Sequence, residues 1–401
     1  MQEGIIIKNL LFMTNLGNSY KIFLDKILEH KNSALDTGRL LEYLNAKGID
    51  YMYIPEDQKE IPLIDQIIHH SQKDGKKILI VNLKTITKLC LQKSKYNNFL
   101  QMVRKNELKL IYYQFGDDLL MMYKLLMSTR PDDVRLSNIL QGLEFSWWSS
   151  GKVGKYFHNH FKKVHVEQLP CFVFGFICGH FSTLATEYEK TNTFFTLTKL
   201  SAGQIRQHRN HLIEKIKDQP YTGHAILKST LINDYTKKKS LFDDLQQDYG
   251  KTFLNHWPYK DMLPAISYYK KTYFELVTET LGATGSDDSF FLTDKTLKPI
   301  IMGHPFILLS TKHMLKNLRE LGFKTFHQHI DESYDESDTL EEKVEIISKN
   351  LKRLDLAGSK KFYDSTREIR AHNQKHLLYL IGSYEFELWK AFNKAFKKIE
   401  F

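Results

Sequence analysis

Continuous apolar runs alternate with segments of helical spacing along the first half of the chain. The clearest runs are residues 77–81 and 108–113, and a third run covers residues 50–54. Between them, residues 63–70 repeat apolar side chains at helical spacing, and Pro62 suits the first turn of that helix. Apolar runs separated by helices are typical of parallel strands buried on both faces. The pattern therefore predicts an α/β domain with a doubly wound parallel sheet.

A similar order resumes after Pro170 and continues to the end of the chain. Strands are expected at residues 171–178, 194–200, 273–278, 305–309 and 324–326, and helices from residue 204 and over residues 296–302, 312–320 and 340–354. Residues 218–264 are irregular and rich in Asp, Lys and aromatic side chains, which predicts loops with short helices. Residues 360–398 have helical spacing almost throughout, with a break expected at Gly382.

The length of 401 residues fits two domains, at roughly 100–200 residues per domain. We expect two Rossmann-like domains, residues 1–185 and 186–360, that face a cleft, followed by C-terminal helices over residues 361–401 that cross back to the first domain. In such folds ligands bind at the carboxyl ends of the strands, and here the two sheets would present those ends to the cleft. A single domain with a helical cap is the alternative architecture.

Composition adds a charge preference and excludes two kinds of site. Lys and Arg number 57 and Asp and Glu 47, so the net charge is +10, which attracts nucleotide phosphates, nucleic acid or acidic glycans without choosing among them. Three Cys without C-x-x-C spacing argue against a disulfide framework and a thiolate zinc site. The start of the chain lacks a secretory signal, and the longest apolar run, residues 169–178, is shorter than the roughly 20 residues of a membrane span. We expect a soluble, cytoplasmic protein.

Residues 290–307 are the most informative stretch. They form a loop that delivers Thr293, Asp294 and Lys295 to the start of a helix, where free N–H groups and the positive dipole end suit a diphosphate or a ribose. The alternative is that Thr293 is only an N-cap, Asp294 complements the dipole and Lys295 is solvated. Glu279, at a strand end just upstream, favours the ligand-binding interpretation.

The same residues resemble the nucleotide-binding signature of the fucosyltransferase-like GT-B glycosyltransferases. In that family a strand ending in Glu precedes a loop carrying aromatic-x-Thr-Glu-Lys. The chain is more similar still to a set of uncharacterised phage and giant-virus proteins. The runs that carry this likeness are Thr293–Pro299, Gly303–Ile307, Leu321–Phe326 and Ile330–Asp335. The resemblance covers roughly residues 195–355, and the first half shows only a loose likeness.

The resemblance implies an inverting, metal-independent glycosyltransferase that moves a sugar from a nucleoside-diphosphate sugar to an acceptor hydroxyl, with no further cofactor. Residues 186–360 would bind the donor and residues 1–185 the acceptor. Lys295 would bind the donor diphosphate, and Asp294 would replace the family's Glu at the ribose. Glu279 matches the Glu near the donor sugar or nucleotide. Phe291 stands where the fucosyltransferases have Tyr, which keeps stacking but removes a hydroxyl donor.

A basic segment, residues 206–211, begins the helix after strand 194–200. By the resemblance, Arg209 holds the donor phosphates, and its planar fork suits a pyrophosphate. His208 is a second donor-binding candidate. The alternative for both is a solvated basic helix face.

An inverting reaction also needs a base near the acceptor hydroxyl. Asp117 follows strand 108–113 through Gly116, and Gly116-Asp117 resembles the Gly-Glu pair that carries the fucosyltransferase base. The alternative is that Asp118 caps a helix and Asp117 is merely exposed. Glu144 and Asp65 are weaker candidates.

Other clusters give weaker signals. His158, His160 and His165 lack an obvious carboxylate partner for a metal site, and a solvated His-rich loop explains them more simply. Trp147 and Trp148 fit either a stacking surface or buried interdomain aromatics.

The acceptor is either a glycan or, given the viral likeness, a hydroxymethylated pyrimidine in DNA, which would place the protein in the host cytoplasm. The Lys and Arg residues are spread along the chain without one concentrated stripe, which favours the glycan. A non-catalytic nucleotide- or nucleic-acid-binding protein with a degenerate donor pocket is the alternative function. Neither the sugar, the nucleotide nor the oligomeric state follows from the sequence.

Overall fold

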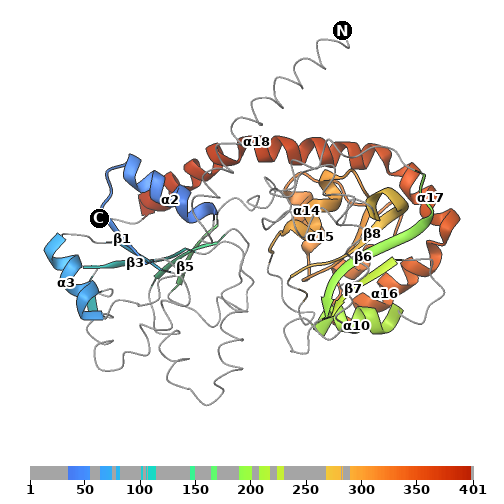
Figure 1. The fold of residues 1–401 in the computed structure, drawn as a ribbon, viewed down its shortest axis with the longest axis horizontal. Coiled ribbons are helices and arrows are strands. Elements are labelled where there is room, and N and C mark those ends of the chain that lie inside the picture. The colour runs from blue at the N-terminus through green and yellow to red at the C-terminus, as the bar shows by residue number, and fades with distance from the viewer. Residues whose placement is uncertain are drawn as a thin grey trace, which may run out of the picture. The chain divides into compact units, whose positions relative to one another are not determined.

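The computed structural model describes the following parts of the chain. They are residues 35–54, 64–74, 78–81, 101–102, 105, 107–113, 145–149, 164–168, 189–200, 207–216, 224–229, 268–280, 282 and 290–398. Two parallel sheets and a long C-terminal helical segment lie within these residues, which confirms the predicted α/β architecture (Figure 1).

The first sheet has five parallel strands in the order β1-β2-β3-β4-β5. They are β1 (Tyr51–Tyr53), β2 (Ile78–Val81), β3 (Lys109–Tyr113), β4 (Phe145–Ser149) and β5 (Val164–Gln168), and the helices α2 (Leu35–Ala46) and α3 (Ile64–Asp74) precede β1 and β2. The first three strands and α3 confirm the predictions from apolar runs and helical spacing.

Strands β4 and β5 were not predicted from the sequence, and β5 corrects the interpretation of His165. Trp147 and Trp148 belong to β4, and His165 belongs to β5 instead of a His-rich loop. Both strands mix polar with apolar residues, so neither forms the continuous apolar run that identifies a buried strand. His158 and His160 lie outside the described residues.

The second sheet has four parallel strands in the order β7-β6-β8-β9. They are β6 (Asn192–Leu200), β7 (His224–Ser229), β8 (Thr272–Thr278) and β9 (Phe306–Leu309). Strand β7 lies within residues 218–264, where only loops and short helices were expected, so the prediction is wrong at residues 224–229; the rest of that segment lies outside the described residues. Its apolar core is only three residues long and is easily overlooked. The strand expected at residues 171–178 lies outside the described residues.

The strand predicted at residues 324–326 is also wrong. The backbone N–H of Lys324 donates to Asn373 Oδ1 at 2.8 Å, and the Asn373 amide donates back to the Lys324 carbonyl at 2.8 Å. A side chain thus satisfies the backbone groups that a neighbouring strand would otherwise pair. Phe326 is buried here between Phe306 and Phe362, which explains the apolar pattern.

Residues 268–271 are helical, and further helical segments accompany the second sheet and follow it to the end of the described chain. They are α10 (Gln207–Ile216), α14 (Asp294–Ile301), α15 (Met314–Glu320), the 3-10 turn η3 (Ser333–Asp335), α16 (Leu340–Arg353), α17 (Leu356–Ser365) and α18 (Arg367–Lys398). The break expected at Gly382 is wrong, because α18 continues through it (Figure 1). Gly382 is exposed there, and one helical Gly costs only about 1 kcal/mol relative to Ala. The interruption falls instead at Thr366, between α17 and α18.

The chain divides into two compact units, and α18 belongs to both. The first unit contains β1 to β5 and the second contains β6 to β9, while residues 382–401 join the first unit. Within the first unit, Tyr43 of α2 donates to Asn393 Oδ1 at 2.8 Å. Its ring also packs against Trp389, Phe392 and Phe396 of α18, with centroids 5.2 to 5.5 Å apart. The end of the chain therefore completes the core around α2.

No helix among the described residues is both long and apolar enough to span a bilayer.

The packing around Tyr43 predicts a contrast between two phenylalanines of α18. Phe392 is fully buried, whereas Phe386 is 70% exposed. We expect Phe392→Ala to lower the free energy of unfolding of the first unit by about 3–5 kcal/mol, because it removes a buried ring. Phe386→Ala should change it by less than about 0.5 kcal/mol. Denaturant titration of both variants measures the difference, and equal effects would contradict this packing.

Candidate functional site

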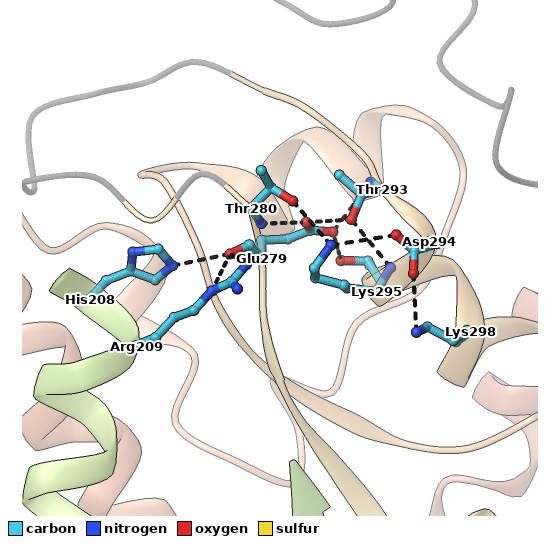
Figure 2. A network of polar contacts seen from close by, with 9 residues as sticks. His208, Arg209, Glu279, Thr280, Thr293, Asp294, Lys295 and Lys298 are labelled. Atoms are coloured by element: carbon cyan, nitrogen blue, oxygen red, sulfur yellow. Dashed lines mark hydrogen bonds and ion pairs between the residues drawn. The ribbon is translucent and has the colours of Figure 1, made fainter. Parts of the chain in front are cut away.

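The candidate site lies where β8 ends and α14 begins. Glu279 and Thr280 follow the last residue of β8, at the carboxyl edge of the second sheet. Thr293 is the N-cap of α14, and its Oγ1 accepts a hydrogen bond from the Lys295 backbone N–H at 3.2 Å. The predicted start of a helix at these residues is confirmed. The amino end of α14 and the end of β8 therefore form one local structure (Figure 2).

The Glu279 carboxylate holds that structure together. It is fully buried and accepts four hydrogen bonds. Oε2 accepts from the Thr280 N–H at 2.8 Å and from Thr293 Oγ1 at 2.6 Å, while Oε1 accepts from the Thr293 N–H at 3.3 Å and from Thr296 Oγ1 at 2.6 Å. To contact a sugar or nucleotide directly, as the family resemblance implies, Glu279 would have to give up one of these bonds.

The backbone carbonyl of Glu279 is held from the other side by α10. Arg209 donates to it through Nε at 3.3 Å and Nη2 at 2.8 Å, and His208 Nε2 lies 3.0 Å away (Figure 2). Both side chains are buried, at 2% and 1% exposure. A Cβ on Gly282 would lie 2.0 Å from His208 Cδ2, so this close approach requires glycine. The two basic residues thus fix the backbone at the end of β8.

Lys295 is the cation at this site with a partly exposed side chain, at 27%. Its Nζ lies 3.1 Å from Thr280 Oγ1 and 3.4 Å from Asp294 Oδ1. Asp294 Oδ2 in turn lies 3.0 Å from the Nζ of Lys298, one turn further along α14. Burial alone would raise the pKa of Asp294, but Lys298 and Lys295 outweigh it and hold that pKa well below its usual range. Asp294 is therefore a carboxylate at neutral pH.

The other predicted site residues differ in how far the structure describes them. Phe291 is 8% exposed in the loop that leads to α14. Asp117, the predicted base, and Glu144 lie outside the described residues. Asp65 lies in the first turn of α3, in the first unit. Among the described residues, no three His, Cys, Asp or Glu side chains come close enough together to hold a metal ion.

Sequence reasoning missed four residues around the site: Thr280, Thr296, Lys298 and Glu275. Thr296 and Lys298 had usable signals, because they stand three residues after Thr293 and four after Asp294, and side chains at those spacings share a helix face. Glu275 is a buried residue of β8 that accepts a hydrogen bond from Tyr269 Oη. Burial raises the pKa of Glu275 to about 7, against the opposing attraction of Lys298.

The four hydrogen bonds to the Glu279 carboxylate form a clamp, in which Thr296 takes part and Thr196 does not. Replacement of these two fully buried threonines should therefore change the unfolding free energy differently. Thr296 donates to a buried carboxylate, and we expect Thr296→Val to cost about 1.5–3 kcal/mol of unfolding free energy. Thr196 Oγ1 has no hydrogen-bond partner among the described residues, so Thr196→Val should be neutral or stabilising. Thermal and denaturant unfolding of the two variants provide the comparison. A neutral Thr296→Val would show that the clamp adds little to stability.

The raised pKa of Glu275 predicts a pH-dependent stability difference. A carboxyl whose pKa rises from 4.5 to about 7 on folding binds more protons in the native state, so its contribution to stability falls as pH rises through this window. At about 1.4 kcal/mol per pH unit the loss is about 3 kcal/mol. We expect Glu275→Gln to gain about that much relative to the native chain between pH 4.5 and 8. Parallel stability curves for the two proteins would contradict the assignment.

Comparison with known proteins gives no family assignment. No protein-family model matches the chain, and no curated protein matches it. Among solved structures, it is similar to sucrose-phosphate synthase from Thermosynechococcus elongatus, at 12% identity over 85% of this chain and 81% of that one, with a TM-score of 0.39. It is also similar to a glycosyltransferase from Rickettsia africae ESF-5, at 11% identity over 90% of this chain and 92% of that one, with a TM-score of 0.32. Both TM-scores are low, so neither likeness carries weight for the function of this chain.

Proposed function

We propose that the chain is a glycosyltransferase that takes a sugar from a nucleoside-diphosphate sugar whose diphosphate binds at the amino end of α14. The observation that carries this proposal is the position of Lys295. Its partly exposed ammonium group stands in the first turn of α14, beside the carboxyl edge of a parallel sheet. Helix amino ends attract phosphates, and α/β proteins bind ligands at this edge.

Lys295 would bind the diphosphate of the donor, and Asp294 would bind its ribose. Among the described residues, the Lys295 ammonium contacts a hydroxyl at 3.1 Å and a carboxylate oxygen at 3.4 Å, so a diphosphate offers it a stronger partner. It would then neutralise the negative charge that grows on the leaving diphosphate. Asp294, ionised and partly exposed, would accept a hydrogen bond from a ribose hydroxyl.

The positions of Lys295 and Asp294 would depend on three buried residues behind them: Glu279, Arg209 and His208. The Glu279 carboxylate fixes the first turn of α14, and the two basic side chains fix the Glu279 carbonyl. For Arg209 to hold the phosphates directly, its guanidinium would have to exchange the Glu279 carbonyl for phosphate oxygens. Phe291 would complete the donor pocket by packing beside the nucleotide.

The transfer itself would invert the anomeric carbon without a metal ion. The acceptor hydroxyl oxygen bonds to that carbon while the bond from the carbon to the diphosphate oxygen breaks. The hydroxyl proton passes to a carboxylate, for which Asp117 is the proposed base, and the diphosphate leaves with the electron pair. We propose a glycan acceptor, because the basic residues are spread along the chain, and a hydroxymethylated pyrimidine in DNA is the other acceptor to test.

Replacement of Lys295 tests the donor site. We expect Lys295→Ala to weaken the binding of the preferred nucleotide about 10- to 100-fold, since it removes a charged hydrogen bond of about 1.5–3 kcal/mol. Lys349→Ala, which removes an exposed lysine of α16, should leave the affinity unchanged. Thermal shifts with UDP, GDP, CMP, TDP, ADP and their sugar conjugates identify the nucleotide, and calorimetry then gives the affinities.

The same panel separates an enzyme from a protein that only binds nucleotides. An enzyme should release the nucleoside diphosphate from its sugar conjugate, at least slowly to water, and Lys295→Ala should suppress that release. Binding without release in the presence of glycan or DNA acceptors would favour the non-catalytic alternative. Equal affinity of the Lys295→Ala and native proteins would remove Lys295 from the donor site.

A further inference from the structure

Two cations share one aromatic ring at the amino edge of the second sheet. Lys190 precedes β6, and its Nζ lies 4.7 Å from the centroid of the Tyr363 ring. Arg370, in the first turn of α18, places its Cζ 3.8 Å from the same centroid. Both side chains are partly exposed. Each residue therefore keeps part of its surface in contact with solvent.

This edge is distinct from the proposed donor site. Glu279 and Lys295 lie beyond the carboxyl end of β8, whereas Lys190 pairs with residues at its amino end, where Tyr273 Oη donates to the Lys190 carbonyl at 3.2 Å. The seven residues of β8 separate the two edges by about 20 Å, at about 3.3 Å per residue.

Among the described residues, Lys190 and Arg370 donate hydrogen bonds to backbone carbonyls, and the Tyr363 side chain also interacts favourably with Arg370. Lys190 Nζ donates to the Tyr269 carbonyl at 2.7 Å. Arg370 donates through Nη1 to the Gly303 carbonyl at 2.7 Å and through Nη2 to the Tyr363 carbonyl at 3.0 Å. Its Nε is buried and has no acceptor among the described residues. Each side chain thus keeps N–H groups that these carbonyls do not use.

No carboxylate of the described residues forms an ion pair with either cation. Asp364, which follows Tyr363, instead pairs with Lys360 at 2.7 Å. Burial and the charge of Arg370 lower the pKa of Lys190 to about 8. Burial together with the charges of Lys190 and Arg370 holds the pKa of His304 well below its usual range. The cluster therefore carries two positive charges that repel each other, and Asp364 offsets the charge of Arg370 only from a distance, without an ion pair to it.

We propose that Lys190 and Arg370 form a binding site for a phosphate dianion. Two positive charges match a dianion, and Lys and Arg are the side chains that proteins use most to bind phosphate. The unused N–H groups of both side chains provide the donors. The bound anion relieves the repulsion that the cluster carries in its absence.

Inorganic phosphate, at constant ionic strength set with chloride, is the probe for this site. We compare thermal shifts and binding isotherms of the native chain with those of Lys190→Met, Lys190→Arg and Lys295→Ala. Phosphate should stabilise the native chain, Lys190→Arg and Lys295→Ala, while Lys190→Met should bind it at least tenfold more weakly. Lys375→Met, which removes an exposed lysine of α18, is the matched control and should behave like the native chain.

Two results would overturn the proposal. If Lys295→Ala loses phosphate binding and Lys190→Met keeps it, phosphate binds only at the end of α14. If phosphate gives no more stabilisation than chloride in the native chain, the two cations are only a structural pair around Tyr363. Because Lys190→Arg keeps the charge, its binding distinguishes loss of the site from a general effect of changing residue 190.

Discussion

The hydrogen bonds of Glu279 organise the second unit around its candidate site. The carboxylate holds the first turn of α14, and the carbonyl of the same residue is held by α10. One residue thereby ties a strand to two helices. A buried carboxylate is costly unless it is hydrogen-bonded, and here four donors meet that requirement. The position of Lys295 depends on this arrangement, because Thr293 both contacts Glu279 and caps the helix that carries Lys295.

Much of the architecture could be predicted from the sequence, because several strands contain nearly continuous apolar runs. Strands β2, β3 and β9 show this pattern directly. Strands β4, β5 and β7 escaped it because their residues are mixed or their apolar cores are short. Residues 324–326 have an apolar pattern typical of a strand but do not form one. The Asn373 side chain of α18 makes the hydrogen bonds with the Lys324 backbone that a neighbouring strand would make.

The spacing of residues predicted the part of the site that is formed by residues close together in the sequence. The helix start at Thr293, Asp294 and Lys295 follows from a capping residue before a periodic segment. The contacts of Arg209 and His208 with the Glu279 carbonyl join residues about 70 positions apart, and no local pattern indicates them. Lys190 and Arg370 are further apart still, and only the folded chain brings both against Tyr363.

The hydrogen bond between Tyr43 and Asn393 joins residues 350 positions apart, and this separation affects the order in which the two units can fold during synthesis. While the ribosome makes the chain, α2 emerges early, but the aromatic rings that complete its core come from the last few turns of α18. At about 5–20 residues per second, that wait lasts about 20–70 s. The second unit, made during this interval, can fold first. A nascent chain that stops short of residue 389 leaves Tyr43 without the aromatic rings of α18 that pack against it in the folded protein.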